Sequence, residues 1–224
     1  MAYHVIERDD AMVVAMDVAQ YFAPFEEWTV GERWACEAAR GRVLDVGCGP
    51  GRHAVELRGR GLEVLGLEPS PGAVAIARER GVEVIDGVVG DVEPGLGSFD
   101  TILLGGQNLG LLESRERGPE VLSRLAAVTA PGGVLLGVGF DPSEFASPEM
   151  KDYAARNLAE GRFAGQQRVR DRYFGVATHW YDYLWPTAAD LHELVDGTPW
   201  SIKEITAEGA HFMAVMTLKP GNRS

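Results

Sequence analysis

The chain has 224 residues, and its 33 acidic side chains against 21 basic ones give a formal net charge of −12. Apolar residues make up 46% and charged residues 24%, which is the balance of an ordinary folded domain and argues against a disordered or fibrous chain. The acidic excess also argues against a nucleic-acid partner, because proteins hold nucleic acids largely by neutralising phosphates.

Other sequence features limit the class of protein further. No apolar run approaches the ~20 residues that a membrane span needs, and the first residues lack a basic and apolar signal segment. The two cysteines, Cys36 and Cys48, suffice neither for a disulfide framework nor for a zinc quartet. The histidines show no metal-ligand spacing. We therefore expect a cytoplasmic protein, monomeric or homodimeric, without a metal and without membrane contact.

The first part of the chain changes character near Arg42. Aromatic residues are irregularly spaced around Pro24, which predicts two short helices on either side of a turn. From Arg42 onward, apolar runs and helical patterns alternate, which predicts βαβ units and a parallel sheet. Strands are predicted at 43–46, 62–67, within 82–90, at 99–104 and at 133–138. Helices are predicted at 52–60, 70–80 and 115–129.

The rhythm breaks after Gly139. Residues 147–160 have a helical pattern, and the aromatic and β-branched stretch 169–184 predicts an antiparallel hairpin turning near Gly175. A helix at 188–195 precedes two strands, 200–206 and 211–218, whose link is too short for a parallel crossover. These last two strands must therefore be antiparallel.

Together, these elements predict one α/β domain with a Rossmann-like, doubly wound sheet. The sheet is mostly parallel, ends in an antiparallel C-terminal strand, and carries an inserted hairpin and helix as a lid. We divide the single domain 1–224 into an N-terminal helical segment (1–40), a cofactor-binding core (41–139), a lid insertion (141–186) and a C-terminal helix and hairpin (187–219).

The strongest functional signal follows the first core strand. The sequence Val-Leu-Asp-Val-Gly-Cys-Gly-Pro-Gly occupies positions 43–51, so a strand runs directly into three glycines and a helix. The dinucleotide fingerprint places two residues before its third glycine, whereas only Pro50 stands there in this chain. Asp45 lies two residues before Gly47, where a carboxylate would repel a pyrophosphate but would suit a cationic ligand.

In this loop the chain resembles the class I S-adenosylmethionine-dependent methyltransferases, and the resemblance extends over nearly the whole chain. It includes an acidic end to the second core strand, a Gly-Asp pair after the third, and the antiparallel terminal hairpin. The resemblance implies S-adenosylmethionine as cofactor, with S-adenosylhomocysteine as product. It further implies methyl transfer by in-line displacement to an oxygen or nitrogen of a small-molecule acceptor.

The same resemblance suggests roles for individual residues. Glu68 would accept hydrogen bonds from both ribose hydroxyls, and Asp91 would accept one from the adenine amino group, with Asp86 as its rival. The predicted cofactor-binding residues are Asp45, Gly47, Cys48, Gly49, Gly51, Glu68, Pro69, Asp91, Val92 and Gly105.

Acceptor binding is expected beside the fourth core strand and under the lid. The predicted substrate residues are Tyr21, Gln107, Asn108, Trp180 and Tyr181. Each has a structural alternative: the amides of Gln107 and Asn108 would cap a loop, and the aromatic rings would pack the lid onto the domain. His53 either touches the methionine carboxylate or lies on a helix face.

His179 and Asp141 are the predicted catalytic residues, with His179 as a base. Asp141 either orients the nucleophile or begins the Asp141-Pro142 turn. Three other functions stay open. The first is a non-catalytic module that binds S-adenosylmethionine or S-adenosylhomocysteine, and the second is a protein-modifying methyltransferase. The third is a nicotinamide oxidoreductase, which Asp45 and the tight glycine spacing disfavour.

Overall fold

Two β-sheets organise the computed structural model, which describes residues 2–145 and 147–220. The larger, the main sheet, has seven strands in the order β11-β12-β7-β6-β3-β4-β5. These strands are β3 (Arg42–Val46), β4 (Glu63–Glu68), β5 (Glu83–Asp86), β6 (Phe99–Leu104), β7 (Thr129–Phe140), β11 (Trp200–Glu208) and β12 (His211–Leu218).

The pairing of these strands confirms the predicted Rossmann-like fold. Strands β3 to β7 are parallel to their neighbours, whereas β12 is antiparallel to both β7 and β11. The chain goes from β3 outward to β5 on one side and then crosses to β6 on the other side of β3. The direction of winding therefore reverses at β3, and ligands in such sheets bind at the carboxyl ends of the strands beside this point.

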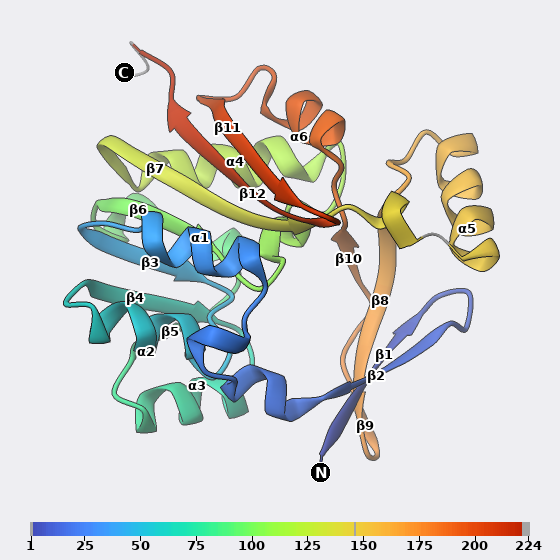
Figure 1. The fold of residues 1–224 in the computed structure, drawn as a ribbon, viewed down its shortest axis with the longest axis horizontal. Helices are drawn as coiled ribbons and strands as arrows, with labels where there is room; N and C mark the ends of the chain where they lie inside the picture. The colour runs from blue at the N-terminus through green and yellow to red at the C-terminus, as the bar shows by residue number, and fades with distance from the viewer. Residues whose placement is uncertain (1, 146, 221–224) are drawn as a thin grey trace.

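Helices cover both faces of the main sheet (Figure 1). One face packs against α1 (Val30–Ala38), α2 (Arg52–Gly59) and α3 (Pro71–Glu79), and the other against α4 (Arg117–Ala127) and α6 (Ala188–Val195). Local sequence explains the helix starts: the Ser70 side chain caps α3, and Thr187 forms a reciprocal capping box with Asp190 in α6.

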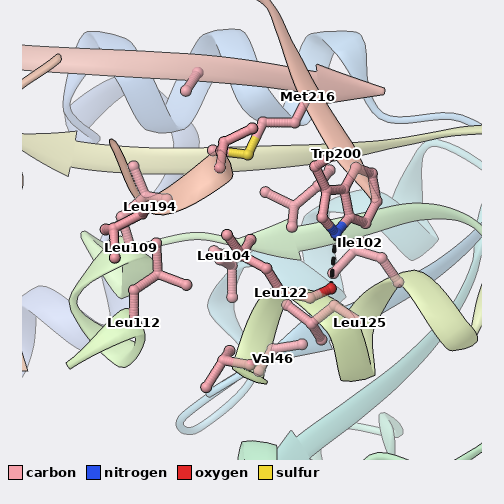
Figure 2. Close-up of a cluster of buried hydrophobic side chains, with 14 of the residues drawn as sticks. Val46, Ile102, Leu104, Leu109, Leu112, Leu122, Leu125, Leu194, Trp200 and Met216 are labelled. Carbon is pink, nitrogen blue, oxygen red and sulfur yellow. Dashed lines mark hydrogen bonds between the residues drawn. The ribbon is translucent and has the colours of Figure 1, made fainter. Parts of the chain in front are cut away.

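The core on the α4 and α6 face consists mainly of leucine side chains around Trp200 (Figure 2). The Trp200 ring is fully buried, and its Nε1–H donates to the Leu122 carbonyl oxygen at 2.7 Å. This bond satisfies the one polar atom of the side chain and joins β11 to α4. The core thereby holds the C-terminal strands against the part of the sheet that carries the glycine loop.

A second sheet stands beside the carboxyl ends of β3 and β4 (Figure 1). Its path is β10-β8-β1-β2, all antiparallel, with β9 also pairing with β8. Its strands are β1 (Tyr3–Arg8), β2 (Val13–Asp17), β8 (Gln166–Tyr173), β9 (Val176–Ala177) and β10 (Tyr181–Leu184). The predicted hairpin near Gly175 is confirmed, since Tyr173 pairs with Val176.

The prediction of helices throughout 1–40 is wrong for its first half. Residues 3–17 form a β-hairpin, because β1 has a ready edge to join at β8 and β2 then covers its other side. Short 3₁₀ helices, η1 (Val18–Phe22) and η2 (Phe25–Glu27), follow before α1. The predicted lid insertion therefore supplies only part of the second sheet. Its helix, α5 (Pro148–Ala159), packs beside this sheet, with the Tyr153 hydroxyl donating to Asp9 at 2.8 Å.

Candidate cofactor and acceptor site

The glycine loop, residues 47–51, leaves β3 at the reversal point of the main sheet. Gly47 has a φ of +71°, and a Cβ built on it would lie 2.6 Å from the Asn108 amide nitrogen. A side chain at this position would therefore be strained and would also collide. Gly49 has a φ of +54° with open space where a side chain would be, so the backbone is accessible there.

Asp45 presents a buried carboxylate without a side-chain donor. The residue is fully buried, and neither carboxylate oxygen makes a full hydrogen bond among the described residues. Burial raises the pKa of Asp45 to about 6, aided by the charge of Glu68, while the charges of His53 and Arg52 and the nearby Ala54 N–H lower it. Buried carboxylates ordinarily have donors, so this group suits a ligand that brings a positively charged donor.

Glu68 links the glycine loop to the end of β4. One carboxylate oxygen accepts from the Gly49 N–H and the other from the Ser70 N–H, each at 2.9 Å. Burial raises the pKa of Glu68, and these two bonds oppose the rise. Since each carboxylate oxygen can accept two hydrogen bonds, both oxygens keep capacity for a diol.

The remaining predicted cofactor residues differ in whether their side chains are exposed to a ligand or buried. Asp91 is exposed beyond β5, and its carboxylate accepts from the Val88 N–H at 2.8 Å, while Val92 is buried in the core. The Cys48 side chain is buried against Gly66 in β4, so only its backbone is left for a ligand. Pro69 is exposed beside Glu68.

The segment after β6 closes over the glycine loop. The Asn108 amide donates to the carbonyls of Val46 and Gly47 at 2.8 and 2.9 Å, so this side chain holds the loop. Gln107 has a φ of +72°, and its carbonyl oxygen accepts from the Tyr183 hydroxyl at 2.8 Å. Of the two roles weighed for Asn108, this geometry favours loop positioning.

A buried ionic cluster lies behind this segment. Glu32 is paired with Arg52, and its Oε1 lies 3.0 Å from His53 Nε2. Burial would raise the pKa of Glu32, but the bonds and charges of His53, Arg52 and Thr29 outweigh it and hold the pKa at about 2. The His53 ring packs edge-on against Trp28 at 4.8 Å and lies directly beside Gly105. His53 is thus a buried, partnered side chain and not a surface residue of the helix.

Tyrosines of the second sheet and of η1 approach the same region. The Tyr21 hydroxyl lies 3.3 Å from His4 Nε2, and Tyr181 donates to Asp171 at 2.6 Å. Burial raises the pKa of Tyr21 to about 12, with contributions from the nearby charges of Asp171 and Glu68. Tyr21 therefore lies between the second sheet and the residues that surround the glycine loop.

The other predicted lid residues lie elsewhere. Trp180 packs under the Arg170 guanidinium at 4.6 Å. His179 is exposed between β9 and β10, without a hydrogen bond or ion pair among the described residues. The Asp141 carboxylate accepts from the backbone N–H and the hydroxyl of Ser143, as a turn-capping residue does. The predicted catalytic roles of His179 and Asp141 gain no support from this geometry.

Sequence reasoning missed three residues that the fold brings into this region, namely Glu32, His4 and Asp171, and it gave no role to Tyr183. The signal for Glu32 was the Thr29-x-x-Glu32 capping pattern, which places that carboxylate at a helix start. No local pattern marks His4 or Asp171, because their positions depend on the pairing of β1 with β8. These strands are far apart in the sequence, and the contacting residues Glu7 and Arg172 are separated by 165 positions.

None of the helices in residues 2–145 and 147–220 combines the length and the apolar character that a membrane span requires. No group of three or more His, Cys, Asp or Glu side chains in the described ranges is arranged to hold a metal ion.

Comparison with known proteins identifies the class. Residues 43–133 match the family described as a methyltransferase domain, and this range holds the glycine loop, Glu68, Asp91 and the segment after β6. Strand order, the reversed β12 and the glycine loop agree with that match. Over residues 43–133 the chain is similar to methyltransferase domains, and its fold is that of the class I S-adenosylmethionine-dependent methyltransferases.

Individual relatives lie at moderate distance. Trans-aconitate 2-methyltransferase of Mycobacterium sp. (strain KMS) is 37% identical over 122 residues, covering 53% of this chain and 44% of the relative. Magnesium-protoporphyrin O-methyltransferase of Rhodobacter capsulatus is 40% identical over 67 residues, covering 28% of this chain and 30% of the relative. The chain thus matches less than half the length of these curated relatives.

Among solved structures, a methyltransferase from Bacteroides fragilis in complex with S-adenosylhomocysteine superposes with a TM-score of 0.82 at 24% identity. The match covers 97% of this chain and 89% of that one, so it includes the second sheet as well as the main sheet. The CcbJ methyltransferase of Streptomyces caelestis reaches a TM-score of 0.64 at 17% identity, over 86% of this chain and 100% of that one. At these identities the similarity concerns the fold.

Proposed function

We propose that this protein catalyses S-adenosylmethionine-dependent methyl transfer to an oxygen or nitrogen of a small-molecule acceptor. The observation that carries the proposal is the buried Asp45 carboxylate, which has no side-chain donor among the described residues and lies beside the glycine loop. The methionine end of S-adenosylmethionine carries an ammonium group, which is the kind of donor that this carboxylate lacks.

The residues around the loop fit the rest of the cofactor. Glu68 keeps two acceptor positions for the ribose hydroxyls while it is held by Gly49 and Ser70. The open space at Gly49 lets a ligand lie against the backbone. Asp91 and the Val92 backbone are proposed for the adenine. No phosphate-binding group is needed, in agreement with the acidic surroundings of the loop.

The acceptor would lie between Gly105–Asn108 and the second sheet. When bound, S-adenosylmethionine supplies an electrophilic methyl group on a sulfonium. The protein's own contribution is to hold the acceptor in line with that methyl and to exclude water, which accounts for most of the rate enhancement in such transfers. Tyr21, Tyr181 and Tyr183 are the side chains proposed to do this, with Asn108 and Glu32 holding the surrounding backbone.

Support for a small-molecule acceptor comes from the names of two relatives, which act on trans-aconitate and on magnesium protoporphyrin. Because this chain covers less than half of each relative, the acceptor itself does not carry over. The second sheet, which gives this chain its acceptor side, lies outside the matched domain of residues 43–133.

Calorimetry on the purified protein tests the cofactor. S-adenosylhomocysteine is expected to bind with a micromolar dissociation constant, whereas NAD is expected to give no measurable heat. Binding of NAD without binding of S-adenosylhomocysteine would overturn the proposal.

A second measurement separates an enzyme from a binding module. The protein is incubated with S-adenosylmethionine and a mixture of small metabolites, and S-adenosylhomocysteine is quantified by mass spectrometry. Accumulation that depends on the mixture supports the enzyme. Binding without any acceptor-dependent accumulation would favour the non-catalytic module instead.

A further inference from the structure

One face of the second sheet, here called the inner face, is defined by Ile6, Asp171 and Tyr181. Ile6 lies directly opposite Asp171 in the β1–β8 register, and the Tyr181 hydroxyl reaches the Asp171 carboxylate. The side chains of Glu7 and Arg170 come from the adjacent positions and therefore project from the other face. The inner face is the one that approaches Tyr21.

Three carboxylates in the strands of this sheet, Asp17, Asp171 and Asp182, have no salt bridge among the described residues, and of these Asp171 is the one on the inner face. Glu7 is paired with Arg170 and Arg172 at 2.9 and 3.0 Å, and Asp10 is paired with Arg8 at 2.8 Å. Asp171 has no salt bridge within the described ranges. Its Oδ2 accepts from Tyr181, and its Oδ1 has no hydrogen-bond partner there. A carboxylate on the acceptor side of the molecule is therefore left without a cation.

The groups around Asp171 would not neutralise it. Arg52 is the cation that lowers the pKa of Tyr21, and it is paired with Glu32. The pKa values of Tyr21, Tyr181 and Tyr183 are all raised, with burial as the first cause and the charge of Asp171 as a further one. The three tyrosines are therefore neutral at physiological pH, and the Tyr181 hydroxyl contacts the carboxylate directly.

We propose that Asp171, together with the rings of Tyr21 and Tyr181, forms a subsite for a positively charged amine group of the acceptor. This inference rests on the proposed function and narrows its substrate class to amines with an apolar or aromatic body. A carboxylate supplies the ion pair, and neutral tyrosine rings attract cations through their faces. An anionic acceptor would instead meet Asp171 and Glu68 without a compensating cation, so the inference separates this chain from the relative named for trans-aconitate.

Three probes that share a phenylethyl body and differ in their terminal group test the charge preference. Phenethylamine, 2-phenylethanol and 3-phenylpropionate are titrated by calorimetry into the full-length protein saturated with S-adenosylhomocysteine at pH 7.5. The amine is expected to bind at least tenfold more tightly than the alcohol, and the carboxylate more weakly than both. Equal or tighter binding of the alcohol or the carboxylate would overturn the inference, as would the absence of amine binding at millimolar concentration.

Variants locate the subsite. Asp171→Asn is expected to weaken phenethylamine at least tenfold and 2-phenylethanol less than threefold. Tyr181→Phe keeps the ring and should weaken the amine less than Asp171→Asn does. Asp182→Asn, on the opposite face of β10, is the matched control and should leave amine binding unchanged. An unchanged amine affinity in Asp171→Asn, with a melting temperature near that of the parent, would also overturn the subsite.

Binding of S-adenosylhomocysteine distinguishes an error in the amine subsite from an error in the proposed function. S-adenosylhomocysteine affinity is measured in every variant, and it is expected to stay within threefold of the parent. If S-adenosylhomocysteine binds but the amine does not, the amine subsite is wrong and the proposed function stands. If S-adenosylhomocysteine itself does not bind, the proposed function is wrong.

Discussion

At the scale of single residues, the role proposed for Asp45 predicts that cofactor binding depends on pH. Its carboxyl has a pKa of about 6, raised by burial from an ordinary value of 3.8. Because this pKa is higher in the folded protein than in the unfolded chain, the ionised carboxylate lowers the stability of the fold above pH 6. This cost in stability decreases as the pH falls from 6 toward 3.8 and the carboxylate is protonated. A bound ammonium needs the ionised form, so ligand affinity changes in the opposite direction and is greatest above pH 6.

We therefore expect the affinity for S-adenosylhomocysteine to be constant from pH 7.5 to 8.5 and to fall about tenfold by pH 5. Below the pKa of Asp45, the fraction of protein with an ionised carboxylate falls about tenfold for each pH unit. Calorimetry across this range measures the effect. Asp45→Asn should bind weakly at every pH, with a flatter profile. An Asp45→Asn profile as steep as that of the parent would assign the pH dependence to Glu68 instead.

Glu68 gives a second prediction at this scale. Glu68→Ala removes the acceptor proposed for two ribose hydroxyls, and hydrogen bonds to charged groups are worth about 1.5–3 kcal/mol each. The affinity for S-adenosylhomocysteine should fall at least tenfold while the protein stays folded. Glu83, which begins β5 and is exposed, is the control. Glu83→Ala should change affinity less than threefold, and an equal loss in both variants would mean that the effect is general electrostatics.

At the scale of elements, Glu32 joins the start of α1 to the start of α2. It accepts from the Thr29 backbone and hydroxyl with one oxygen and engages Arg52 and His53 with the other. Its pKa of about 2 lies below the ordinary 4.5, so its stabilisation is present above pH 4.5 and is lost as the pH falls toward 2.

Replacing Glu32 by Gln should lower the free energy of unfolding by about 3 kcal/mol at pH 7, because a buried ion pair that loses one partner leaves the other charge uncompensated. Urea unfolding at pH 7 and pH 3 checks this, and the variant should lose less stability than the parent between these values. Glu56→Gln is the control, since the Glu56–Arg60 pair of α2 is solvent-accessible and should contribute less than about 1 kcal/mol. Equal losses in the free energy of unfolding for Glu32→Gln and Glu56→Gln would contradict this prediction.

The elements that the sequence predicted well are those whose signals are local. Strand β6 and helix α6 have the bounds expected from their apolar runs and flanking residues, and α3 begins where Ser70 and Pro71 indicate. Strand β1 escaped prediction because its residues are mostly half-buried on both faces, which gives neither an alternating pattern nor a continuous apolar run. It becomes a strand through its pairing with β8, a contact that no short window contains.

The candidate site divides in the same way. The residues proposed for the cofactor follow consecutive strands of the main sheet, so a parallel fold brings Asp45, Glu68 and Asp91 together once it is recognised. The proposed acceptor side is built by residues from both ends of the chain, such as Tyr21 and Asp171, whose approach depends on the second sheet. Sequence reasoning named Tyr181 as a candidate there but had no means to find its partner Asp171.

At the scale of the whole molecule, the two sheets should therefore serve separate steps. Val5 lies in β1 between β2 and β8, opposite Ala15 on one side and Arg172 on the other. Val5→Pro removes a backbone N–H and is incompatible with a central strand, so it should disrupt the second sheet. Hydrogen exchange is expected to show lost protection in β1, β2 and β8, with protection retained in β3 to β7.

In this variant, S-adenosylhomocysteine affinity should stay within about threefold of the parent, because Asp45, Glu68 and Asp91 all belong to the main sheet and its loops. Phenethylamine binding to the loaded protein should fall at least tenfold, since Asp171 and Tyr181 lose their support. Val5→Thr, which keeps the N–H and the branched shape, is the matched control and should preserve both affinities. A parallel collapse of both affinities in Val5→Pro would mean that the second sheet also holds the cofactor, most directly through Tyr21 and the segment that follows β2.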